Sequence, residues 1–193
     1  MKKSLICTIA ILSCVYIRSD IIQDSGVADS FAGAAFSNDI QGMKSIIHKE
    51  NWTKENRIIN SHAKLGNETA LHQASYWANR AAIKFLLKKG ADVNALDKDG
   101  KTALIRLVEQ GSCPFKIEHV KKYISVIKLL KKWGANINAQ SFLNAKKEPG
   151  WTSLHFAEYF KNREIAEFLR SEGARSDIPN GAGQTADDFR KAK

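Results

Sequence analysis

Cysteine is scarce in this sequence, and its placement excludes a fold held together by internal disulfides. Only three cysteines occur among 193 residues, and two of them, Cys7 and Cys14, lie within the first 19 positions. Removal of that segment would leave Cys113 as the remaining thiol. A single cysteine is more often a small buried apolar residue than a reactive one, although an intermolecular bridge stays open as an alternative.

Long apolar stretches are also lacking. Residues 4–17 carry no charge, but these 14 positions fall short of the ~20 apolar residues of a transmembrane helix. Because Lys2 and Lys3 precede them, we expect a secretory signal peptide over 1–19, a linker over 20–28, and export to the periplasm, envelope or extracellular space. Two alternatives are a lipoprotein signal ending before Cys14, which would become a lipid anchor, and an amphipathic helix docked on the domain.

The motifs of common catalytic sites are absent as well. The sequence contains no H-E-x-x-H, no paired C-x-x-C, no glycine-rich phosphate loop and no G-x-S-x-G. His48, His62 and His119 show no ligand-like spacing and are expected to be solvated. We therefore expect a chain that is not an enzyme, with no catalytic residue, no metal site and no cofactor.

Acidic residues are outnumbered by basic ones. The chain has 30 Lys plus Arg against 20 Asp plus Glu, a formal net charge of +10. The surplus is concentrated in residues 66–140, which hold 13 basic and 6 acidic residues. Such a distribution makes an acidic protein, an anionic lipid surface or a nucleic acid a candidate partner.

The sequence does contain a repeated motif that begins with threonine. Its copies are residues 69–74 (TALHQA), 102–107 (TALIRL), 152–157 (TSLHFA) and a degenerate 185–188 (TADD). A second motif follows the first three copies, at 90–94 (GADVN), 134–138 (GANIN) and 173–177 (GARSD). The threonines are 33, 50 and 33 residues apart, and the glycines 44 and 39 apart. These intervals locate two insertions, around residues 110–122 and 141–148.

Both motifs and their period resemble those of ankyrin repeats, over roughly residues 29–190. The resemblance implies an all-α solenoid of paired antiparallel helices with hairpin loops. We expect about four repeats including degenerate caps, within a domain that spans 29–193. Residues 29–49 would form a worn first unit, and residues 185–191 would close the other end.

Individual motif residues have expected structural roles. Thr69, Thr102 and Thr152 precede short apolar runs and are expected to cap helices. Glycines 90, 134 and 173 stand where a left-handed residue ends a helix. For His72 and His155 the resemblance implies a hydrogen bond within or between repeats. Ser112 and Pro114 are expected to start a lengthened second helix in the second full repeat.

The resemblance also implies a contact surface made of hairpin tips and exposed positions of the first helices. The residues at these positions are Tyr76, Trp77, Lys98, Lys101, Glu109, Gln110, Trp151, Tyr159 and Phe160. Five of them are aromatic, and binding hot spots favour Trp and Tyr. The alternative is that an insertion, or the segment 49–65, folds over the aromatic side chains and buries them.

The function implied by the resemblance is protein–protein interaction by a monomer, whether as an inhibitor, an escort or a host-directed factor. The alternative is electrostatic attachment to membrane or nucleic acid through the basic middle repeat. Its lysines are Lys116, Lys121, Lys122, Lys128, Lys131 and Lys132. Nucleic acid is disfavoured, because specific recognition of bases and phosphates favours arginine over lysine.

Overall fold

The computed structural model describes residues 26–49, 58–63, 66–112, 120–142 and 148–191. The helices are α2 (Val27–Phe36), α3 (Ile40–Lys49), α4 (Ala70–Tyr76), α5 (Arg80–Lys88), α6 (Ala103–Gly111), α7 (Val120–Lys132), α8 (Ser153–Tyr159), α9 (Arg163–Ser171) and α10 (Ala186–Lys191). Two short strands, β1 (Gln140–Phe142) and β2 (Pro149–Thr152), lie between α7 and α8. None of the described helices is long and apolar enough to cross a membrane.

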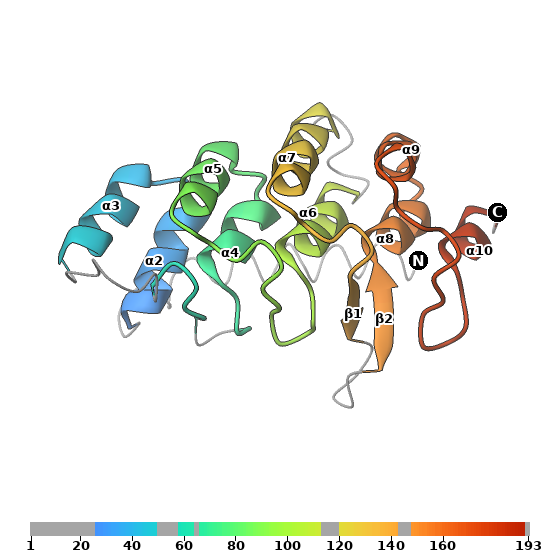
Figure 1. Ribbon diagram of the computed structural model, residues 1–193, viewed down its shortest axis with the longest axis horizontal. Helices are drawn as coiled ribbons and strands as arrows, with labels where there is room; N and C mark the ends of the chain where they lie inside the picture. The colour runs from blue at the N-terminus through green and yellow to red at the C-terminus, as the bar shows by residue number, and fades with distance from the viewer. Residues whose placement is uncertain (1–25, 50–57, 64–65, 113–119, 143–147, 192–193) are drawn as a thin grey trace, which may run out of the picture.

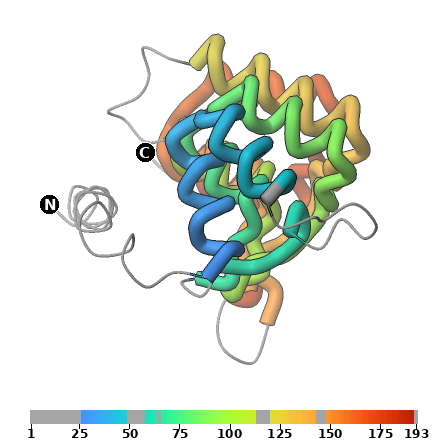
Figure 2. The backbone as a smooth tube through the Cα atoms, turned by 90° about the vertical axis from the view of Figure 1, so that its left-hand side faces the viewer, coloured from blue at the N-terminus to red at the C-terminus, as the bar shows by residue number. Residues whose placement is uncertain are grey.

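The helices form two rows (Figure 1). The inner row is α2, α4, α6, α8 and α10, in which each helix contacts the next. The outer row is α3, α5, α7 and α9, and each of these helices packs on the inner helix that precedes it in the chain. Viewed from the N-terminal end, the first pair of helices lies in front of the later repeats (Figure 2). The expected solenoid of paired helices is confirmed, including the worn first unit and the short final helix.

Threonine begins the inner helices of the full repeats, as expected. The Oγ1 atom of Thr102 accepts a hydrogen bond from the Ile105 N–H at 3.3 Å, and Thr152 Oγ1 accepts from the His155 N–H at 3.4 Å. At Thr69, the backbone N–H donates to His72 Nδ1 at 3.2 Å. These bonds satisfy amides that have no partner within the first turn of a helix.

Glycine ends three of the outer helices in a left-handed conformation. The φ angles of Gly90, Gly134 and Gly173 are 89°, 88° and 95°. The N–H of the residue after each glycine reaches back to the helix, as in the bond of 3.0 Å from Ala91 to the Leu86 carbonyl. This is the Schellman arrangement, which satisfies carbonyls that the helix leaves without partners.

The hydrophobic core lies between the two rows. Leu71, Leu104 and Leu154 of the inner helices are at most 1% exposed. The outer helices contribute buried residues at helical spacing, which are Ile83, Leu86, Leu87, Ile127, Leu130, Ile165 and Leu169. Ile124 and Phe168 pack against this core and stay partly exposed. Because each pair of helices buries its apolar face on its neighbours, the repeats stabilise one another.

A ladder of asparagine side chains joins successive hairpins. The Asn94 Nδ2 donates to the Gly134 carbonyl at 3.0 Å, and Asn94 Oδ1 accepts from the Asn136 N–H at 2.8 Å. Asn60 makes the same two bonds to Gly90 and Asp92, and Asn138 makes them to Gly173 and Arg175. Each asparagine therefore fixes the register of one hairpin against the next.

Both insertions fall between helices or strands. The first lies between α6 and α7, and α7 has 13 residues against nine each in α5 and α9, which confirms the lengthened helix. Its expected start at Ser112 is wrong, because the Ser112 N–H bonds to the Val108 carbonyl at 2.8 Å and Ser112 is the C-cap of α6. Pro114 lies outside the described residues. The second insertion separates β1 from β2, which pair antiparallel.

The expected N-terminal divisions fall mostly outside the described residues. The expected signal peptide, the alternative lipoprotein signal ending before Cys14 and most of the expected linker lie within residues 1–25. The first described helix, α2, begins at Val27, two positions before the expected domain start at 29.

Candidate functional site

The predicted contact residues lie at corresponding positions of consecutive inner helices. Tyr76 ends α4, Glu109 lies near the end of α6, and Tyr159 ends α8. The five predicted aromatic side chains are all partly exposed, and most of the segments that could cover them, 50–57, 113–119 and 143–147, lie outside the described residues. They do not form one patch, however, because α6 contributes charged side chains between them.

The N-terminal aromatic cluster consists of Phe36, Tyr76 and Trp77. The Trp77 ring lies 5.2 Å from the Phe36 ring and 5.4 Å from the Tyr76 ring, centroid to centroid, with edge-to-face geometry in both cases. Phe36 ends α2, so the cluster joins the worn first unit to the first full repeat. Aromatic pairs with this geometry attract one another beyond the area that they bury.

The C-terminal aromatic cluster is larger and consists of Trp151, Phe156, Tyr159, Phe160 and Phe189. The Trp151 ring lies 4.9 Å from Tyr159, 5.0 Å from Phe156 and 5.0 Å from Phe189. Phe160 packs edge to face on Tyr159 at 5.2 Å. Because Phe189 belongs to α10, the terminal half repeat supports the predicted contact residues from one side.

A charged network, here called the Arg106 network, separates the two clusters. The Arg106 guanidinium binds the Asp97 carboxylate at 2.6 Å (Nε to Oδ2), the Glu68 carboxylate at 3.1 Å and the Asp99 carboxylate at 3.2 Å. Glu109 lies 3.8 Å from the same guanidinium and 2.8 Å from Lys101 Nζ. Four carboxylates thus surround two cations, which leaves an excess of negative charge at the centre of the surface.

The environment of this network shifts two pKa values. Burial raises the pKa of Glu68 above its ordinary 4.5, and the nearby Asp97 and Asp99 reinforce the rise against the opposing effect of Arg106. Burial disfavours the charge on Arg106, but the surrounding carboxylates outweigh that effect and raise its pKa. Arg106 therefore stays charged and is the centre that holds the carboxylates together.

The remaining predicted residues differ in exposure. Lys98, at a hairpin tip, is exposed. The Nζ atom of Lys101 lies over the face of the Phe156 ring, 5.4 Å from its centroid. This contact joins the Arg106 network to the C-terminal aromatic cluster. Gln110 is only 8% exposed, so its side chain offers little area to a partner.

The two motif histidines have structural hydrogen bonds, as the resemblance implied. His72 Nε2 lies 2.9 Å from the Lys101 carbonyl oxygen, and His155 Nε2 lies 3.2 Å from the Gln184 carbonyl oxygen. Both carbonyls belong to the next hairpin. Of the other histidines, His48 is exposed on α3, His62 is exposed in a loop, and His119 lies outside the described residues. Within the described parts of the chain, no three His, Cys, Asp or Glu residues are grouped so that they could hold a metal ion.

Sequence reasoning missed Asp97 and Arg106. Asp97 is 3% exposed, and its Oδ1 accepts bonds from the N–H groups of Asp99 at 2.8 Å and Lys101 at 2.9 Å. In front of α10, Asn180 Oδ1 accepts the two corresponding bonds, from the N–H groups of Ala182 at 3.0 Å and Gln184 at 2.9 Å. Asp97 and Asn180 each stand five positions before a motif threonine, Thr102 or Thr185. This repeated offset is the signal that could have located Asp97, whereas no repeated pattern marks Arg106.

Comparison with known proteins agrees with this geometry. A family model for ankyrin repeats, in three copies, matches residues 31–141, more than half of the chain. The chain is 33% identical over 113 residues to the B-cell lymphoma 3 protein homolog of Mus musculus, a match that covers 58% of this chain and 21% of the relative. It is 29% identical over 120 residues to an ankyrin repeat protein of Acanthamoeba polyphaga mimivirus, covering 58% and 20%. It is 48% identical over 50 residues to one of Fowlpox virus (strain NVSL), covering 26% of each chain.

The chain thus spans only about a fifth to a quarter of the length of these relatives. The family-model match runs from within α2 through α7 and ends at residue 141, before α8 begins. With the period, the caps and the paired helices, it establishes that the chain belongs to the ankyrin-repeat family.

Proposed function

We propose that this chain binds a protein partner on the surface made by the two aromatic clusters and the Arg106 network between them. Ankyrin repeats are in general protein–protein interaction modules. The single observation that carries the proposal is the position of Tyr76, Glu109 and Tyr159 at the corresponding place on three consecutive inner helices. A partner that lies along the inner row would contact all three.

The aromatic clusters support this surface as the centre of binding. Hot spots at interfaces are enriched in Trp, Tyr and Arg, and they work best where neighbouring groups exclude water. Trp77 and Trp151 are held by aromatic neighbours on two sides, so little side-chain freedom remains to be lost on binding. Partly exposed aromatic groups of this kind are favourable contact sites once a partner covers them.

The charge of the surface indicates what the partner presents. Asp99 and Glu109 are the most exposed carboxylates of the Arg106 network, at 44% and 29%. A lysine or arginine of the partner placed against them would balance the excess negative charge. We therefore propose a partner segment with a cation between two apolar side chains, one for each aromatic cluster.

We also propose that the chain is exported, on the strength of Lys2, Lys3 and the uncharged stretch 4–17. Mass spectrometry of the mature protein from its native cell tests this directly. Loss of the first 19 residues supports export, and lipidated Cys14 as the first residue supports an anchored form. A mature protein that begins at Met1 or at Lys2 argues against export and against the lipid anchor.

The binding proposal is tested by affinity capture with the full chain as bait. The double variant Trp77→Ala with Tyr159→Ala removes one side chain from each cluster. The matched control is Trp133→Ala, whose side chain is 43% exposed after α7 in the outer row. We expect the same partner to be recovered by the wild type and the control at high salt, and to be lost with the double variant while circular dichroism is unchanged. Equal recovery by all three would refute the proposal.

A further inference from the structure

The outer row of helices carries charge of one sign over most of its length. Helices α3, α5 and α7 contain ten lysine and arginine residues and no aspartate or glutamate. The next outer helix, α9, is different, because Glu164 and Glu167 are both exposed there. The basic region therefore ends between α7 and α9, and it lies in the opposite row from the proposed protein-binding surface.

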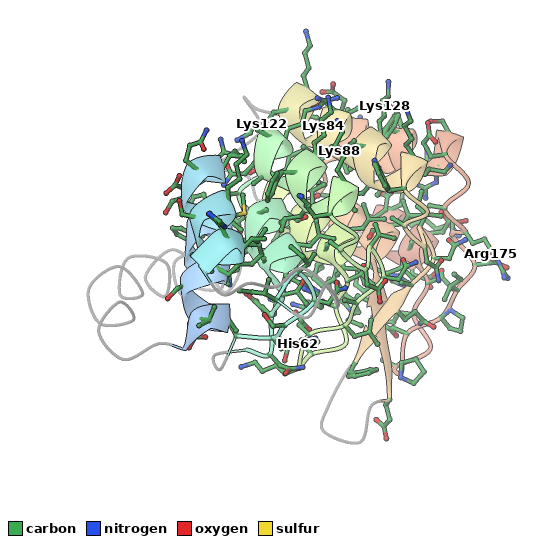
Figure 3. The ribbon with its side chains drawn as sticks, turned by 60° about the vertical axis from the view of Figure 1, so that its left-hand side comes forward. His62, Lys84, Lys88, Lys122, Lys128 and Arg175 are labelled. Atoms are coloured by element: carbon green, nitrogen blue, oxygen red, sulfur yellow. The ribbon has the colours of Figure 1, made fainter. Side chains whose placement is uncertain are left out.

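Within this region the cations line up along two helices. Arg80, Lys84 and Lys88 are spaced four residues apart on α5, so they share one face of the helix. Lys121, Lys128 and Lys132 share one face of α7 because they are seven and four residues apart. All six side chains are exposed. These six residues are called the basic stripes below. Figure 3 shows Lys84, Lys88, Lys122 and Lys128 together on one side of the molecule, with His62 on the opposite side.

The stripes are not balanced by carboxylates. Among the described residues, ion pairs join Arg106, Arg170 and Arg175 to acidic side chains, but none involves a residue of the basic stripes. Lys131, beside them on α7, is paired with Glu172 at 2.8 Å.

Like charges four residues apart on a helix are mildly destabilising. Lys128 Nζ lies over the Phe168 ring, 5.2 Å from its centroid, which gives that lysine one stabilising contact within the fold. Stability of the fold does not account for the other five cations, and an external anion would reduce the repulsion between them.

We propose that the basic stripes bind the surface of an anionic phospholipid membrane. Clusters of four to eight Lys and Arg residues are typical of segments that bind anionic lipid, because each cation near the surface is attracted to the headgroups. Lysine suits this role, since a mobile headgroup needs only a point charge. Trp133 follows Lys132 directly and is 43% exposed, and an indole ring is well suited to the region of the headgroups.

A nucleic acid fits these observations less well. Recognition of bases requires a helix or strand that enters a groove, and phosphate contacts favour the arginine fork. The basic stripes contain one arginine and five lysines, spread over two neighbouring helices of a row. Membrane binding through this row would leave the inner helices free, so a protein partner and a membrane could be bound at the same time.

The experiment is co-sedimentation of the full chain with lipid vesicles. One set contains phosphatidylcholine alone, and the other contains about 30% phosphatidylglycerol. The test variant is Lys84→Gln, Lys88→Gln, Lys121→Gln and Lys132→Gln combined. The control variant is Lys98→Gln, Arg175→Gln, Arg190→Gln and Lys191→Gln, which are exposed residues outside the outer row. Each variant lowers the formal net charge of +10 by four and keeps residues 1–19 unchanged.

We expect the wild type to prefer anionic over neutral vesicles at about 50 mM salt, and to lose this preference at about 500 mM, where charges are screened. Because each cation contributes roughly fivefold to partitioning and the test variant removes four, it should bind anionic vesicles about 600-fold less tightly. The control variant should stay within about fivefold of the wild type.

Three results would overturn the proposal. Equal binding to neutral vesicles would assign the interaction to apolar residues such as those of segment 4–17. Equal losses in both variants would show that net charge, not the stripes, matters. The third result is that the wild type binds duplex DNA more tightly than anionic vesicles at equal phosphate concentration, and that the test variant loses this DNA binding. It would assign the stripes to nucleic acid.

Discussion

The Nε2 atom of His72 lies 2.9 Å from the carbonyl oxygen of Lys101, while its Nδ1 atom receives the Thr69 N–H at 3.2 Å. The proton of the neutral ring therefore sits on Nε2, and the imidazole links the start of one inner helix to the hairpin of the next repeat. Ile105 occupies the corresponding position of the second full repeat and is completely buried. The 2.6 Å bond from the Phe142 N–H to the Asp99 carbonyl at that joint has counterparts at the other two, from Lys98 to Gly66 at 3.1 Å and from Gly181 to Pro149 at 2.7 Å, so it is common to all three joints.

His72→Ala should lower the free energy of unfolding by about 1–3 kcal/mol, because it leaves the buried Thr69 N–H and the Lys101 carbonyl without their partner. Urea denaturation followed by circular dichroism measures this loss. The matched control is His62→Ala, in which an exposed histidine is removed. A midpoint for His72→Ala equal to that of His62→Ala would show that water replaces the imidazole at no cost.

Stability should fall on mild acidification. Burial lowers the pKa of His72 below its ordinary 6.5, more than Asp97 and the Lys101 carbonyl raise it, and burial likewise lowers the pKa of His155. The unfolded chain therefore binds protons more tightly than the folded one. The contribution of both rings is complete above about pH 6.5 and is lost as the pH falls from there through the folded pKa values.

The measurement is the urea midpoint between about pH 7.5 and pH 5. The wild type should lose stability across this interval, and the double variant His72→Ala with His155→Ala should show a shallower slope. Parallel slopes in the two proteins would attribute the acid sensitivity to carboxylates instead.

The repeat architecture could be predicted from sequence because its determinants are local. A threonine just before an apolar helix, or a glycine just after one, acts within one turn of chain. That is why the caps at Thr102 and Thr152 and the left-handed Gly90 appear where the motifs place them. The 33-residue period then positions each pair of helices on the next.

The neighbours of the predicted contact residues could not be predicted in the same way. Phe189 meets Trp151 from 38 positions further along the chain, and Glu68 meets Arg106 across two repeats. Both contacts depend on how far the hairpins and α10 fold back, which no local motif specifies.

Alignment predicts Gln110 at the surface together with Trp77 and Phe160, which hold the same position in their repeats. Trp77 and Phe160 follow the last residues of α4 and α8, whereas α6 continues to Gly111, so Gln110 lies within the helix and is only 8% exposed.

Three turns between paired helices place a residue other than glycine at positive φ. These residues are Asn38 at 57°, Ala78 at 51° and Lys161 at 59°. Asparagine tolerates this conformation, whereas β-branched residues do not. Lys161→Asn should therefore raise thermal stability slightly, and Lys161→Val should lower the free energy of unfolding by about 1–2 kcal/mol. Differential scanning calorimetry distinguishes the two, and identical melting temperatures would mean that the turn relaxes.

Gly100 and Gly183 hold the same position in two hairpins and should respond differently to alanine. Their φ angles are 66° and 75°, so each Ala variant should lose about 1–2 kcal/mol from strain. A Cβ on Gly100 would also lie 2.5 Å from the Phe142 ring, whereas a Cβ on Gly183 meets no atom within 4 Å. Gly100→Ala should therefore cost about 1–3 kcal/mol more. Adding Phe142→Ala to both proteins should remove this difference in urea denaturation, and a difference that persists would contradict the steric explanation.

Arg106 and Arg175 provide the sharpest comparison of buried and exposed ion pairs. The side chains of Arg106 and Asp97 are 14% and 0% exposed, whereas those of Arg175 and Asp177 are 64% and 68% exposed. Arg106→Met leaves the Asp97 carboxylate buried without its cation, which should cost about 3–5 kcal/mol in the free energy of unfolding. Arg175→Met should cause no measurable change, since solvent screens the exposed pair.

Urea denaturation of both arginine variants at low and high salt measures the contrast, and Arg106→Lys tests how much of the effect depends on the guanidinium fork. A loss in Arg106→Met no larger than the loss in Arg175→Met would show that the buried ion pair contributes as little to stability as the exposed one.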